Sequence, residues 1–116
     1  MDLGEGRAGL AVQAGGSLRL NSLNVANGNV SGENGGGILV TGVGSFLEID
    51  FSEVFGNTAS VLATLGGRGS GIRIEFGATA EIDGASIRNN ISSNPGAGIS
   101  VNQAGLTLKN TTITTN

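Results

Sequence analysis

Hydrophobic and polar residues alternate along this chain in short runs, and the runs recur in a fixed order. Each unit opens with a glycine and two aliphatic residues two positions apart, continues with a second alternating run, and ends on an aliphatic residue shortly before an asparagine. Alternation over a few residues is typical of half-buried β-strands. The first runs are 9–12, 37–40, 71–74 and 98–101, the second runs are 18–20, 47–49, 80–82 and 106–108, and the third runs end at Val25, Val54, Ile87 and Ile113.

The spacing of the runs indicates one repeated unit with a single enlarged copy. The equivalent positions 10, 38, 72 and 99 are 28, 34 and 27 residues apart, and the second and third runs show steps of 29, 33 and 26. A repeat of this length is the signature of a stacked architecture. Between the third run and the next first run the chain is five or six residues longer in the second unit, so the extra residues lie within 55–71.

The pattern predicts an all-β fold. No connection is long enough to hold the crossover helix of a βαβ unit, so parallel strands can pair only if the chain winds on itself. We therefore expect a right-handed parallel β-helix of about four coils with three short strands each. We expect 1–116 to be a single domain and a segment of a longer solenoid, because no polar cap follows the last coil and residues 1–8 before the first coil are too few to form one. The alternative is a chain whose ends pair with another copy.

Composition excludes several classes of protein and site. The net charge is −3 and no basic stripe is present, which excludes nucleic acid as the partner. Cys and His are both absent, which excludes disulfides, thiolate or imidazole metal sites and His-dependent catalysis. No run of 18 apolar residues exists, so we expect no membrane-spanning helix in this segment.

Several motifs resemble a known family. The segments 35–38 (GGGI), 96–99 (GAGI) and 55–57 (FGN) resemble the GGxI and FxxN repeats of polymorphic outer-membrane proteins and autotransporter passengers. Residues 104–113 (AGLTLKNTTI) are similar to rungs of bacterial surface proteins that form right-handed parallel β-helices. The resemblance covers 9–116 and implies an extracellular or bacterial cell-surface module that serves in adhesion or display. It also implies relatives among polysaccharide lyases and hydrolases.

Acidic residues recur at the outward positions of the second runs. Because neighbouring coils lie ~4.8 Å apart, the winding should bring four carboxylates onto one face. They are Glu48, Asp50, Glu81 and Asp83. Three interpretations are open: a solvated polar face flanked by Arg19 and Lys109, a Ca²⁺ site, or an acid/base pair for glycan cleavage.

Two further features are candidates for structural or binding roles. We expect a column of stacked asparagines at one corner, made of Asn27 or Asn29, Asn57, Asn90 and Asn116. In the enlarged connection, three aliphatic residues either form a small satellite core or contact a partner, and an arginine either binds a carboxylate or is solvated. These residues are Val61, Leu62, Leu65 and Arg68.

These observations support two functional hypotheses. The first is a non-enzymatic structural or adhesion module whose faces contact a host surface, a glycan or a protein ligand, with end-to-end self-association as a further mode. The second is a fragment of a carbohydrate-active β-helix with an acidic, calcium-binding face. The first hypothesis requires no cofactor, whereas the second requires calcium.

Overall fold

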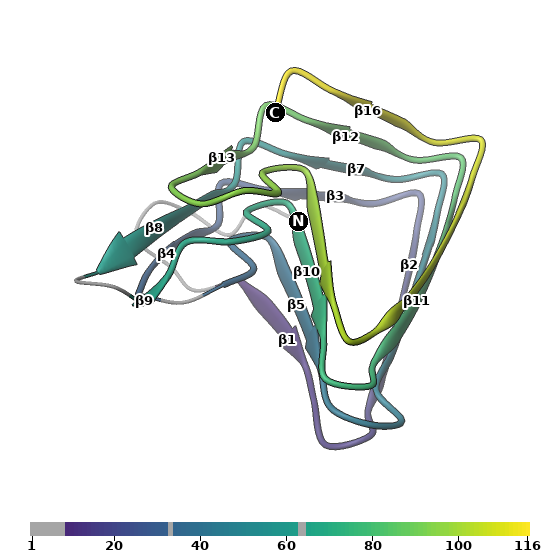
Figure 1. Ribbon diagram of the computed structural model, residues 1–116. Helices are drawn as coiled ribbons and strands as arrows, with labels where there is room; N and C mark the ends of the chain where they lie inside the picture. The colour runs from purple at the N-terminus through teal and green to yellow at the C-terminus, as the bar shows by residue number, and fades with distance from the viewer. Residues whose placement is uncertain (1–8, 33, 63–64) are drawn as a thin grey trace.

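The computed structural model describes residues 9–32, 34–62 and 65–116, without the side chains of 62, 65 and 66. Every regular element in this part of the chain is a β-strand, and the strands wind into a solenoid (Figure 1). The chain runs anticlockwise in Figure 1 as it comes toward the viewer, so the winding is right-handed. Among the described residues no helix is long and apolar enough to cross a membrane.

Three four-stranded parallel sheets form the three sides of the coil, as predicted. The first sheet contains β1 (Leu10–Val12), β5 (Ile38–Thr41), β10 (Ile72–Glu75) and β14 (Ile99–Asn102). The second contains β2 (Ser17–Asn21), β6 (Phe46–Asp50), β11 (Thr79–Asp83) and β15 (Gly105–Lys109). The third contains β3 (Asn24–Ala26), β7 (Glu53–Phe55), β12 (Ser86–Arg88) and β16 (Thr112–Thr114). The predicted register is confirmed, because equivalent residues of the four strands are paired with one another. They are Leu10, Ile38, Ile72 and Ile99.

A fourth, shorter sheet was not predicted, so three strands per coil is an incomplete description. It consists of β4 (Asn29–Ser31), β8 (Thr58–Leu62) and β13 (Ile91–Ser92). The enlarged connection includes β8 of this sheet and a further strand, β9 (Leu65–Gly66). β9 pairs antiparallel with β8. In Figure 1, β8 and β9 project from the side of the solenoid.

Columns of aliphatic side chains fill the inside of the coils. Ile38, Leu47, Ile49, Ile72 and Ile74 are fully buried, and the valines and isoleucines of the third sheet complete the core in the first three coils. The last coil is different, since no coil covers it in the described structure. Its inward residues Val101, Leu108 and Ile113 are 42%, 42% and 45% exposed.

The glycine that opens each unit is required by close contact between coils. A Cβ atom on Gly37 would lie 2.6 Å from the carbonyl oxygen of Gly71, and one on Gly71 would overlap the carbonyl oxygen of Gly98. Any side chain at these positions would push successive coils apart. This explains the glycine that leads the first strand in each of the first three coils, whereas a Cβ on Gly98 would meet Ile113 and Asn116 of its own coil.

The asparagine column is present, but its first member was predicted wrongly. Asn57 is buried, and its amide nitrogen donates to Oδ1 of Asn90 at 3.0 Å. The amide nitrogen of Asn90 in turn donates to Oδ1 of Asn116 at 2.8 Å. In the first coil the equivalent residue is Gly28, neither Asn27 nor Asn29, and its backbone N–H donates to Oδ1 of Asn57 at 2.9 Å. At the first coil, the backbone N–H of Gly28 therefore makes the hydrogen bond that an asparagine side chain makes in the later coils.

Candidate functional site

The outer face of the second sheet brings the four predicted carboxylates together. Glu48 pairs in register with Glu81, and Asp50 pairs with Asp83, on the neighbouring strands β6 and β11. Arg19 lies beside Glu48 on one side, and Lys109 lies beside Asp83 on the other. The order of charges across the face is therefore cation, two acidic rows, cation, as the sequence predicted.

The two acidic rows have different partners. Arg19 contacts Glu48 at 3.4 Å through Nε and Asp50 at 3.5 Å through Nη2, and the guanidinium is largely exposed. Exposed pairs of this kind contribute at most about 1 kcal/mol each. Asp83 accepts a hydrogen bond from the side-chain amide of Asn110 at 3.0 Å. Glu81 makes no ion pair with any other residue that the structure describes, so its carboxylate is available to a ligand.

The side chains of this face enclose a shallow groove with a volume of about 160 Å³. This volume is below the about 300–1,000 Å³ that is usual for small-molecule sites. The groove therefore fits one small polar group, such as part of a sugar ring, rather than a whole large ligand. Its walls are Glu48, Asp50, Glu81, Ile82, Asp83, Thr107 and Lys109.

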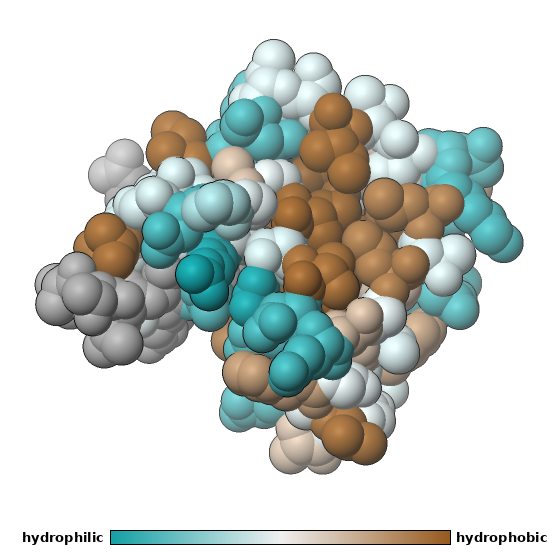
Figure 2. Space-filling model, in the orientation of Figure 1, coloured by the Kyte–Doolittle hydropathy of each residue, from teal (hydrophilic) through white to brown (hydrophobic). Residues whose placement is uncertain are grey.

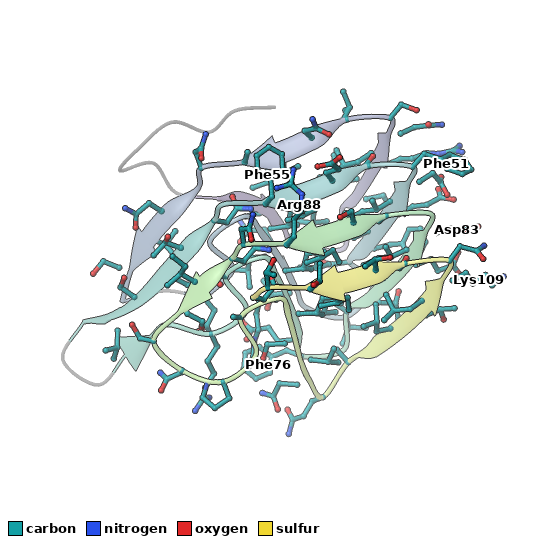
Figure 3. The ribbon with its side chains drawn as sticks, turned by 90° about the horizontal axis from the view of Figure 1, so that it is seen from above. Phe51, Phe55, Phe76, Asp83, Arg88 and Lys109 are labelled. Atoms are coloured by element: carbon teal, nitrogen blue, oxygen red, sulfur yellow. The ribbon has the colours of Figure 1, made fainter. Side chains whose placement is uncertain are left out.

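An exposed aromatic ring lies at the corner next to the groove. Phe51 follows Asp50 directly, has a φ of 49°, and is 70% exposed. A left-handed backbone is uncommon for an aromatic residue. Its ring covers Gly84 of the next coil, where an added Cβ would lie 2.7 Å from the ring. Figure 3 shows Phe51, Asp83 and Lys109 along one edge of the molecule in successive coils.

The arrangement of the carboxylates does not match the ligand geometry of a calcium site. Calcium takes six to eight oxygen ligands in proteins. In the described part of the chain, no three acidic side chains converge closely enough to hold a metal ion. Glu48 and Asp50 are moreover turned to Arg19. The arrangement is better suited to donors spread along a groove than to a single ion.

Of the residues predicted in the enlarged connection, Val61 and Arg68 do not line this groove. Val61 lies in β8 opposite Gly66, and its side chain is 41% exposed. The side chains of Leu62 and Leu65 lie outside the described part, so the satellite core stays a prediction. Arg68 is exposed, and its backbone N–H donates to Oδ1 of Asn34 at 3.1 Å.

Sequence reasoning missed Phe51 and a buried ion pair. An alignment of the corners would have found Phe51, since Ser22, Gly84 and Asn110 occupy the same place in other coils. Arg73 and Glu75 are outward on β10 yet buried, with Nε 2.8 Å from Oε2. The residues just before β10 lie against the outer face of this strand. This is shown by Gly69, where an added Cβ would lie 2.8 Å from the Cβ of Arg73. The alternation of residues along a strand does not predict that a neighbouring segment covers its outer face.

Comparisons with known proteins give no relative for this chain. No protein-family model matches it, and neither the curated proteins nor the solved structures contain a significant match.

Proposed function

We propose that this chain is a non-enzymatic adhesion module of a secreted or bacterial surface protein, and that the groove on the second sheet binds a hydroxyl-rich ligand such as a glycan. The observation that carries the proposal is the register of β6 and β11. It aligns two rows of carboxylates over a rigid core, next to an exposed aromatic ring. The assignment to a bacterial surface rests on the resemblance of the repeats.

Several properties of the groove support a neutral polar ligand. Carboxylates accept hydrogen bonds from hydroxyl groups, and Lys109 and Thr107 add donors at the other wall. An aromatic ring offers an apolar face on which the C–H face of a sugar can stack, and Phe51 presents such a face to solvent. The charges of Arg19 and Lys109 offset part of the acidic charge, which reduces the preference for cations.

The proposal can be tested with a glycan array, followed by calorimetric titration of the glycans that bind. Two variants should weaken binding: Phe51→Ala, which removes the stacking surface, and Glu81→Gln, which removes the carboxylate that has no ion pair. A stacking contact is worth about 1 kcal/mol, which corresponds to a five- to tenfold loss of affinity. Both changes are at exposed positions, so the thermal midpoint should stay close to that of the unmodified chain.

A matched control is available at another corner. Phe76 is 54% exposed with a φ of 54°, so it resembles Phe51 in setting but lies away from the groove. Phe76→Ala should leave glycan affinity unchanged. Equal losses for Phe51→Ala and Phe76→Ala, or no binding to any glycan, would rule out the groove as the binding site.

A second candidate is a carbohydrate-active fragment with a calcium-dependent face, which the paired carboxylates of neighbouring strands favour. A ligand that binds only the native state raises the unfolding midpoint. Calcium titration with thermal melting therefore tests this candidate directly. A calcium-dependent rise that disappears in Asp83→Asn would support it, and a flat response at saturating calcium would exclude it.

A further inference from the structure

We propose that three backbone bonds of this chain are sites of spontaneous succinimide formation, and that in each of them the next coil of the solenoid blocks the reaction by binding the reactive N–H. The three bonds join an asparagine or an aspartate to a glycine, and they lie at 27–28, 34–35 and 83–84. No other glycine of the sequence follows an asparagine or an aspartate. The inference is independent of the proposed ligand of the groove.

The reaction at such a bond needs no enzyme. The backbone nitrogen of the glycine attacks Cγ of the preceding side chain, and the new bond closes a succinimide ring. At asparagine the side-chain nitrogen leaves with the glycine proton as ammonia, whereas at aspartate a side-chain oxygen leaves as water. Water then opens the ring to aspartate or isoaspartate. Glycine favours the reaction because it has no side chain and its backbone takes up the required conformation easily.

The bond between Asn27 and Gly28 shows how a neighbouring coil prevents this reaction. The N–H of the buried Gly28 donates to Oδ1 of Asn57 in the second coil at 2.9 Å. Asn27 itself is exposed, and it lines a hollow at the corner together with Gly28 and Thr58. Water therefore reaches the side chain that would be attacked. The attacking nitrogen, however, must first break a buried hydrogen bond, which lowers the population that can react.

The bond between Asn34 and Gly35 is held at two points by one residue. The N–H of Gly35 donates to the carbonyl oxygen of Arg68 at 2.9 Å. The N–H of Arg68 in turn donates to Oδ1 of Asn34 at 3.1 Å. Arg68 lies in the enlarged connection, just before β10 of the next coil. Its backbone therefore fixes both the nitrogen that would attack and the side chain that would be attacked.

The bond between Asp83 and Gly84 is held in the same way by the fourth coil. The N–H of Gly84 donates to the carbonyl oxygen of Lys109 at 3.0 Å, and Oδ1 of Asp83 accepts from the side-chain amide of Asn110 at 3.0 Å. All three bonds lie where the chain turns between strands. Figure 2 shows the last coil end-on, with apolar side chains gathered inside its outline and polar side chains around it. Hydrogen bonding to the next coil, rather than distance from water, therefore protects these turns.

The unmodified chain provides the first test. The folded chain and the chain unfolded in guanidinium chloride are incubated side by side at mildly alkaline pH. Chromatography and mass spectrometry of the digested peptides then measure aspartate and isoaspartate at each site over time. Asn27 and Asn34 should deamidate, and Asp83 should isomerise, at least about twofold more slowly in the folded chain, because each reaction requires a hydrogen bond to open. Equal rates in the folded and unfolded chains would overturn the proposal.

Two variants separate the effect of the neighbouring coil from that of overall stability. Asn57→Ala frees the N–H of Gly28, so Asn27 should deamidate about two- to tenfold faster, while Asn34 in the same molecule keeps its rate. The matched control is Asn90→Ala, which removes a buried amide of the same column but leaves the bond between Gly28 and Asn57 in place. It should not accelerate Asn27.

The two asparagine–glycine sites report on each other in this experiment. Equal acceleration of Asn27 and Asn34 in Asn57→Ala would show that general unfolding exposes the sites, and would refute protection by the neighbouring coil. The same conclusion would follow if Asn90→Ala accelerated Asn27 as much as Asn57→Ala does. Circular dichroism establishes that each variant is folded, and the comparison of the folded and unfolded unmodified chain requires no variant.

Discussion

The buried amide of Asn57 gives the sharpest test of the stacked architecture. Its Oδ1 accepts from the N–H of Gly28 at 2.9 Å, and its Nδ2 donates to the carbonyl of Val25 at 3.2 Å and to Oδ1 of Asn90 at 3.0 Å. Asn57→Ala would leave the N–H of the buried Gly28 without its acceptor and remove a donor from the carbonyl of Val25. Each buried polar group without a partner costs about 1–3 kcal/mol.

We therefore expect Asn57→Ala to lower the free energy of unfolding by about 3 kcal/mol. For a chain of this size the loss corresponds to a fall in melting temperature of roughly 10–15 °C. The matched control is Asn116→Ala, at the exposed end of the same column, where water can replace the lost hydrogen bonds. Its cost should stay within about 1 kcal/mol.

Urea unfolding followed by circular dichroism measures both variants, and equal slopes with denaturant would show that the denatured states are comparable. If Asn57→Ala and Asn116→Ala lose the same stability, the corner amides contribute only as surface residues. The hydrogen-bonded column would then have no structural role. A loss confined to Asn57→Ala supports stabilisation of each coil by the coils above and below it.

Two further predictions concern the first sheet. Glu75→Gln leaves the buried charge of Arg73 beside the neutral hydroxyl of Ser100 without its acidic partner, and should cost about 3–5 kcal/mol. The double change Arg73→Leu with Glu75→Thr, which copies Leu39 and Thr41 of the preceding coil, should be nearly neutral. Thermal melting of the single and double variants checks this, and an unstable double variant would contradict it. Gly71→Ala places a Cβ against a carbonyl oxygen of the next coil and should lower the free energy of unfolding by about 1–3 kcal/mol. Urea unfolding measures this loss. Unchanged stability would show that the two coils can separate at this position.

The sequence predicted the fold because each coil repeats one pattern of inward aliphatic residues. A step of 26 to 34 residues that keeps Ile38, Ile72 and Ile99 equivalent allows only one register, since a shift by one residue would turn every aliphatic side chain outward. The same register placed Glu48 beside Glu81 and Asp50 beside Asp83. The location of the extra residues in 55–71 followed from counting alone.

Other features depended on contacts that no local pattern encodes. The fourth sheet has strands as short as two residues, which leave no visible alternation. Gly28 occupies the place of the expected asparagine because the pairing of Val25 with Val54 fixes that corner. The spacing of the sequence fits Asn27 and Asn29 equally well. Burial of Arg73 and Glu75 came from a segment folded over the outside of the sheet.

The sequence by itself thus determined the winding, the register and the charges on each face, because these follow from the period of the repeat. Only the tertiary structure decided which outward side chains are covered, which carboxylates Arg19 neutralises and where the groove lies. The physical reason is that periodicity sets the direction of a side chain, whereas its surroundings depend on the corners and connections, which vary from coil to coil.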